Sequence, residues 1–227
     1  MNRKALCRHW IAVAALLTCG ATSAANLVTN GSFEQPNIVG GGYVLYTTGS
    51  TDITGWTVLG PAGDSVQLTP DTYAGLQADQ GRQWVDLTGI YGYDKGLRSD
   101  AFATTVGATY RIAFAVGNYI PFGPSTLGLS ISGGPEQLFT NPSVAANLKS
   151  PMNWASFSFD WVADATSAQL SFLGRANGTL SNNGGIGLDS VSVEWVSGPV
   201  PEPGTWALMA VGLGALTSWS ARRRRSA

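Results

Sequence analysis

The side chains able to carry chemistry in this sequence are carboxylates and aromatic rings. Its one histidine, His9, and its two cysteines, Cys7 and Cys19, all fall within the first 19 residues. Serine–histidine and cysteine–histidine catalysis need these residue types, and so do ordinary zinc, copper and haem sites. The rest of the chain is therefore limited to carboxylate chemistry or ligand binding, and we expect no redox or organic cofactor.

Two carboxylates could hydrolyse a glycosidic bond if the fold held them at a catalytic separation. Four of the aspartates in the body of the chain are candidates, but each has the surroundings of a turn or a strand edge, and no spacing pairs them. We therefore predict that the protein is not an enzyme. A glycosidase becomes the better interpretation only if a cleft holds two of them together. The four residues are Asp86, Asp94, Asp160 and Asp164.

Sugar binding usually relies on exposed flat aromatic rings that stack on pyranose rings, with amides and carboxylates bonding the hydroxyls. Tyrosines in glycine-rich segments are the natural candidates, whereas the tryptophans in strand-like segments more often belong to a core. Loop tyrosines also pack loops onto a sandwich, so this alternative stays open for each of them. The predicted carbohydrate-binding residues are Tyr91, Tyr93, Asp94, Asn118 and Tyr119.

The elements that must position these residues are β-strands. Apolar and polar residues alternate with a period of two over several segments, which is typical of half-buried antiparallel strands. No amphipathic helical stretch longer than about two turns interrupts them. We predict an all-β fold, an antiparallel two-sheet jelly-roll sandwich. The expected strands include residues 53–59, 65–69, 83–87, 97–104, 110–116, 127–131, 156–161, 170–172 and 191–195.

The N-terminal segment predicts export. Arg3, Lys4 and Arg8 precede an apolar run at residues 10–17, and small residues follow at 22–25, so residues 1–25 form a secretory signal peptide with a helical core. The body is then residues 26–198 and the tail residues 199–227. Six of the 13 Lys and Arg residues and 13 of the 14 acidic residues fall in the body, a net charge of about −7. This charge argues against nucleic acid as a partner.

Three features follow one another in the tail. Pro201, Glu202 and Pro203 form an extended segment that cannot pair in a sheet. Residues 205–221 carry no charge and would reach about 25 Å as a helix, close to the hydrocarbon thickness of about 30 Å. A cluster of arginines then acts as a stop-transfer signal on the cytoplasmic side. The cluster is Arg222, Arg223, Arg224 and Arg225.

This tail resembles the PEP-CTERM sorting signal of Gram-negative bacteria. The resemblance implies transient insertion of a C-terminal transmembrane helix in the inner membrane and recognition of Pro201-Glu202-Pro203 by an exosortase-type membrane protease. The cleaved protein would then reach the cell surface or an extracellular matrix. An ordinary C-terminal anchor that is never cut is the alternative.

The two ends of the body carry its most informative motifs. Residues 26–34 read Asn-Leu-Val-Thr-Asn-Gly-Ser-Phe-Glu and are expected to form the first strand. In the last strand, apolar residues fall on Ile186 and Leu188 and then on Val191 and Val193. The pleat therefore changes phase near Asp189, which predicts a β-bulge there.

With these motifs in view, the body resembles the galactose-binding-like jelly rolls of carbohydrate-binding modules. It is similar to a cell-wall-associated family that opens with Asn-Gly-Ser-Phe-Glu and closes with Asp-Ser-Val-Ser-Val. Segments 55–58, 78–87 and 102–115 also resemble that family's strands. The resemblance implies one structural calcium between the first and last strands, bound by Asn30, Ser32, Glu34 and Asp189, because calcium prefers carboxylate and carbonyl oxygens. Alternatively, Glu34 and Asp189 accept backbone hydrogen bonds.

Two functions agree with these features. The first is an exported surface or matrix protein whose sandwich binds carbohydrate, either an exopolysaccharide or a cell-wall glycan. The second is a non-catalytic structural matrix or surface-layer protein that acts through protein–protein contacts. Exposed tyrosines serve both purposes, so the sequence separates the two functions poorly.

Overall fold

The computed structural model describes residues 25–89, 92–119, 124–142, 152–175, 185–199 and 208–213. Within these ranges the chain forms 13 strands and a short helical stretch at residues 208–213. Most of the predicted signal helix and of the predicted C-terminal membrane helix lies outside the described residues. Of the helical segments that are described, none has the length and hydropathy needed to cross a membrane.

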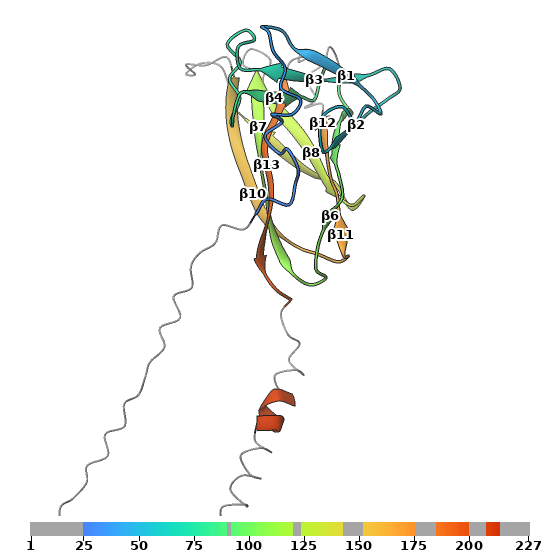
Figure 1. The fold of residues 1–227 in the computed structure, drawn as a ribbon, viewed down its shortest axis with the longest axis vertical. Helices are drawn as coiled ribbons and strands as arrows, with labels where there is room; N and C mark the ends of the chain where they lie inside the picture. Colours follow the sequence, from blue (N-terminus) through green and yellow to red (C-terminus); the bar gives the residue numbers. More distant parts are fainter. Residues whose placement is uncertain are drawn as a thin grey trace, which may run out of the picture.

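The strands build two main antiparallel sheets that face each other, as Figure 1 shows. In sheet order, the six-stranded sheet consists of β1 (Val44–Thr47), β3 (Ser65–Pro70), β4 (Gln83–Asp86), β13 (Ile186–Ser197), β7 (Thr109–Tyr119) and β10 (Met152–Val162). The five-stranded sheet consists of β2 (Trp56–Leu59), β5 (Gly96–Ser99), β12 (Leu170–Arg175), β8 (Ser125–Ile131) and β9 (Gln137–Asn141). Two short strands, β6 (Phe102–Ala103) and β11 (Ser167–Ala168), pair separately. The predicted all-β jelly-roll sandwich is confirmed.

The core lies between the sheets because one side chain in two points inward from each strand. Ile112, Phe114 and Val116 of β7 are at most 2% exposed, and they face Leu129 and Phe172 of the other sheet within one cluster of buried residues. The predicted bulge is also present. The pairing of β13 with β7 shifts between Asp189 and Ser192, and Ser190 has a φ of 54°.

The prediction of a first strand at residues 26–34 is wrong, because this segment consists of turns that run beside β13. The amide of Leu27 donates to the carbonyl of Val193 (2.9 Å), and the amide of Val191 donates to the carbonyl of Gly31 (2.8 Å). Positive φ angles of 54° at Asn30 and 56° at Phe33 break the extended backbone. The turn drives the Phe33 ring into the core.

A second apolar cluster covers the outer face of the six-stranded sheet. Trp84 points away from the core, since its neighbour Val85 points into it, and it packs with Leu76 and Met152. The indole N–H of Trp154 donates to the carbonyl of Gln77 (2.9 Å). Gly117 makes room for this packing, because a Cβ there would lie 2.2 Å from the Met152 Cε. The loop that follows β3 is thereby fixed over the sheet.

Candidate functional site

The predicted calcium residues Glu34 and Asp189 do converge, but they converge on the backbone of one loop. The Asp189 Oδ2 accepts hydrogen bonds from the amides of Asp79 and Gln80, both at 2.9 Å. The Glu34 Oε1 accepts from the amides of Arg82 (2.8 Å) and Gln83 (3.0 Å). Two carboxylates from opposite ends of the body therefore hold the segment that leads into β4. We call this arrangement the amide clamp.

Gly81 sits at the centre of the amide clamp. Its φ is +75°, and a Cβ at this position would lie 2.4 Å from the Glu34 Oε1. A side chain here would therefore meet the carboxylate in a backbone conformation that other residues rarely adopt. The clamp explains why glycine stands between the two pairs of donated amides.

Burial dominates the electrostatics of Asp189. The side chain is fully buried, and this loss of water raises the pKa of its carboxyl to about 7. Hydrogen bonds from the amides of Gln80 and Ser190 act in the opposite direction, while the nearby negative charge of Asp79 raises the pKa further. The hydroxyl of Ser190 donates to the Asp79 Oδ2 at 2.6 Å, which holds the two acids side by side.

Calcium at this place stays a prediction. The Asn30 side chain is engaged in a turn, where its Nδ2 donates to the carbonyls of Gln35 (2.6 Å) and Thr54 (3.0 Å). One carboxylate oxygen of Glu34 already accepts hydrogen bonds from two backbone amides, and so does one carboxylate oxygen of Asp189. Among the described residues, no three or more His, Cys, Asp or Glu side chains group closely enough to hold a metal ion. The geometry fits amide binding better than cation binding.

The predicted carbohydrate-binding residues lie in two separate places. Tyr93 and Asp94 precede β5, where Tyr93 packs partly against the core and Asp94 pairs with Arg175. Tyr119 ends β7 and packs partly against the outer cluster. Asn118 is completely buried, so its side chain is closed to a ligand in this conformation. Tyr91 lies outside the described residues.

The other aspartates weighed for catalysis also have separate environments. Asp86 is buried, and its Oδ1 accepts from both the amide (2.8 Å) and the hydroxyl (2.6 Å) of Thr88. Asp160 pairs with Arg111 at 2.9 Å on the surface. Asp164 is exposed near the end of β10. Asp94 pairs with Arg175, as described above.

A cleft that the sequence did not reveal lies between β9 and β10. Phe157, Phe159 and Trp161 occupy the inward-facing positions of β10, yet each remains half-buried. The reason is topological, because β10 ends the six-stranded sheet and β9 ends the five-stranded sheet. Rings at the open side of the sandwich have core neighbours on one side only. The Phe159 ring stacks on Phe139 of β9, with centroids 5.8 Å apart and planes at 15°.

The cleft has a volume of about 250 Å³ and combines rings with a few polar groups. Gln137 supplies an amide and Asp164 a carboxylate, beside apolar walls. No lysine or arginine is found among the residues described as lining it. Its lining consists of Leu129, Ile131, Gly134, Pro135, Gln137, Phe159, Trp161 and Asp164.

Sequence comparison locates one motif, in the tail. Residues 199–225 match the family described as "PEP-CTERM protein-sorting motif". The chain carries a PEP-CTERM sorting motif. The match begins at Pro199, directly after the sandwich, and includes the Pro-Glu-Pro segment and the four arginines. Of the matched residues, Pro199 and residues 208–213 lie within the described ranges. No curated protein matches the chain in sequence.

Structure comparison finds carbohydrate-binding modules among the similar folds. The CBM22-1 xylan-binding domain of Paenibacillus barcinonensis Xyn10C has 16% identity and a TM-score of 0.44, over 78% of this chain and 99% of that one. TmCBM61, solved with β-1,4-galactotriose, has 13% identity and a TM-score of 0.45, over 77% and 100%. An arabinose-bound α-L-arabinofuranosidase, MgGH51, has 12% identity and a TM-score of 0.46, over 76% of this chain and 27% of the enzyme. At such identities the likeness concerns the fold alone.

Proposed function

We propose that the protein is exported and that its sandwich binds a neutral polysaccharide, an exopolysaccharide or a cell-wall glycan, in the cleft between β9 and β10. The observation that carries this proposal is the row of half-buried rings along β10. Phe159 and Trp161 stand two residues apart on one face of the strand, a spacing of about 6.5 Å. Rings presented in this way can stack on the apolar faces of sugar rings, while Gln137 and Asp164 bond hydroxyls.

The charge of the cleft supports a neutral ligand. Asp164 is the ionisable group described in its lining, and the body carries a net charge of about −7. A uronate-rich chain would bring further negative charge to this surface and be repelled. We therefore favour xylan-, galactan- or glucan-like chains over alginate-like ones.

Removing one ring from the cleft is expected to weaken glycan binding at least tenfold, since each aromatic platform contributes about 1.5 kcal/mol or more when it covers a sugar. The variants are Trp161→Ala and Phe159→Ala, and calorimetry measures their affinity for a panel of neutral and anionic polysaccharides. Tyr43→Ala is the matched control, because Tyr43 is an exposed aromatic residue away from the cleft.

Unchanged affinity in both cleft variants would overturn the site. A loss on Tyr93→Ala or Tyr119→Ala instead would favour the loop residues predicted from the sequence. If the wild-type protein binds no glycan of the panel, the structural-matrix function becomes the better one. One observation already favours that second candidate: among the described strands, β10 has a partner on one edge only over its 11 residues. Such an edge can pair with another copy of the chain.

The sorting motif supports a route for the protein. We propose that residues 205–221 insert transiently in the inner membrane, with Arg222–Arg225 on the cytoplasmic side, and that an exosortase-type protease cuts near Pro201-Glu202-Pro203. The body then reaches the cell surface or the matrix. Replacing Glu202 by Ala is expected to leave the protein at precursor mass in the membrane fraction. Mass spectrometry of the fractions checks this, and normal release of the variant would argue against recognition of the motif.

A further inference from the structure

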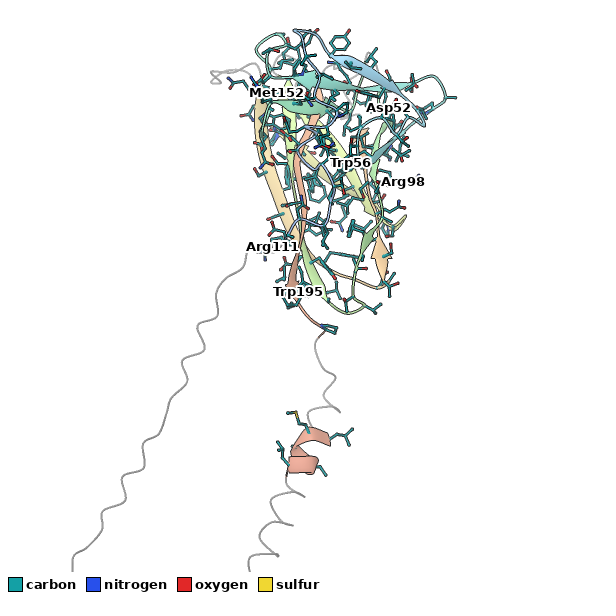
Figure 2. The ribbon with its side chains drawn as sticks, in the orientation of Figure 1. Asp52, Trp56, Arg98, Arg111, Met152 and Trp195 are labelled. Atoms are coloured by element: carbon teal, nitrogen blue, oxygen red, sulfur yellow. The ribbon has the colours of Figure 1, made fainter. Side chains whose placement is uncertain are left out.

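Exposed apolar side chains gather at the end of the sandwich from which the tail departs. Trp195 is 52% exposed, Val162 57%, Val106 52% and Val196 40%. Figure 2 shows Trp195 at this end, opposite Met152 at the other end. We call these four residues the apolar tip. Side chains of this size and exposure are costly to hold in water, so their gathering at one end needs an explanation.

Strand pairing brings the three segments of the tip together. Val162 and Ser197 both pair with Thr109, the first residue of β7. The amide of Gly107 donates to the carbonyl of Ala163 at 2.7 Å, which places the turn at Val106 beside the end of β10. Pro199, at the exit of the chain, also lies against Gly107. The tip and the start of the sorting motif are therefore neighbours.

The length of the connection keeps the tip close to any membrane that the tail enters. Residues 198–204 link the sandwich to the uncharged segment, and seven residues span at most about 25 Å. The described part of that segment, residues 208–213, is helical and leaves Leu208 75% and Val211 70% exposed. This helical stretch therefore exposes apolar side chains to water, which is energetically unfavourable.

The chemistry of the tip fits the interface of a bilayer rather than charged headgroups. Trp and Val side chains favour the boundary between headgroups and acyl chains. The ionisable groups near the tip are mainly acidic: Glu194, Asp164, and Asp160 in its pair with Arg111. These charges do not attract anionic lipid. Four side chains bind weakly by themselves, but a tethered contact profits from a high effective concentration.

We propose that the apolar tip rests on the outer surface of the lipid bilayer while the tail is inserted, so that the sandwich stands on the membrane and keeps the Pro-Glu-Pro segment at its surface. The inference rests on the proposed insertion of the tail. The partner is a zwitterionic lipid interface, and the contact is apolar, so it is insensitive to salt.

Site-specific fluorescence in proteoliposomes tests the proposal with the full chain. Cys7→Ser and Cys19→Ser remove the native thiols, and single cysteines at Val162, Val39 or Gly212 carry an environment-sensitive dye. In phosphatidylcholine vesicles we expect a blue shift and quenching by brominated lipid at Val162 and at Gly212. No change is expected at Val39, which is 92% exposed and lies near the start of β4, at the other end. Trp195→Ser with Val196→Ser should abolish the response at Val162 and leave that at Gly212 intact.

Each outcome decides a different claim. A dye at Gly212 in lipid with a dye at Val162 in water overturns the tip contact and leaves the tail insertion standing. A dye at Gly212 in water overturns the insertion, and the tip contact with it. A response at Val162 that appears only at high protein density would assign the tip to contact between two copies of the chain, which also contradicts the proposal.

Discussion

Replacing Asp189 by Ala is expected to lower the free energy of unfolding by about 3 kcal/mol or more, because three backbone amides lose their acceptor. These amides belong to Asp79 and Gln80 of the loop, both at 2.9 Å, and to Ser190 at 2.6 Å. The site is fully buried, so water cannot replace the carboxylate without opening the amide clamp. Urea denaturation measures the loss.

Graded variants identify the cause. Asp189→Asn keeps one carbonyl oxygen for the two loop amides but turns an N–H toward Ser190, so about half the loss is expected. Asp160→Ala is the matched control, since Asp160 is a surface residue paired with Arg111, and its removal should cost less than about 1 kcal/mol. An Asp189→Ala variant as stable as the control would contradict the clamp.

The same variants test the calcium prediction. The amide clamp predicts the same loss of stability in calcium and in chelator, since its donors belong to the protein itself. A structural calcium predicts that the wild type melts at a higher temperature with calcium and that Asp189→Ala removes this difference. A loss that occurs only in calcium would favour the metal over the clamp.

Period-two alternation was enough to predict the sandwich, because side-chain direction in a strand follows from local geometry. The alternation of β7 and β10 matches their pairing, and the phase change near Asp189 matches the bulge in β13. The prediction of a strand at residues 26–34 failed because it also rested on local sequence alone. Their composition suits a strand, but the turn at Asn30 depends on hydrogen bonds to Gln35 and Thr54.

The candidate sites were harder to predict because they depend on long-range topology. Asp189 accepts a hydrogen bond from the amide of Asp79, which lies 110 residues earlier in the sequence. No local sequence pattern predicts that contact. Phe157, Phe159 and Trp161 of β10 alternate like core residues, and only the place of β10 at the sheet edge leaves them half-buried. Asn118 shows the converse, since it was predicted to bind carbohydrate but is completely buried.

Raising the pH from about 4 to about 7 is expected to destabilise the fold, by on the order of 3 kcal/mol for each of two buried acids. Burial is the largest cause in both, and it raises the pKa of Asp86 to about 6 and that of Asp189 to about 7. Their ordinary value is 3.8. At a pH between the unfolded and the folded pKa, each acid keeps a proton in the folded state that it has lost in the unfolded state. Its contribution to the free energy of unfolding is therefore fully present below about pH 4 and is lost as the pH rises through the folded pKa.

Urea denaturation between pH 4.5 and 8 measures this dependence, and variants assign it. Asp86→Asn keeps an oxygen for the amide and hydroxyl of Thr88 and should lower the slope of the profile below about pH 6, where Asp189 still contributes. Asp189→Ala should lower the slope over the whole window and remove the part that continues to about pH 7. The loss caused by Asp189→Ala is then larger at pH 5 than at pH 8. Stability that rises with pH across this window would mean that the donated amides outweigh burial and keep both carboxylates charged. In that case Asp189 would be ionised at neutral pH, as a calcium ligand must be, whereas a carboxyl that stays protonated up to about pH 7 is a poor ligand for calcium.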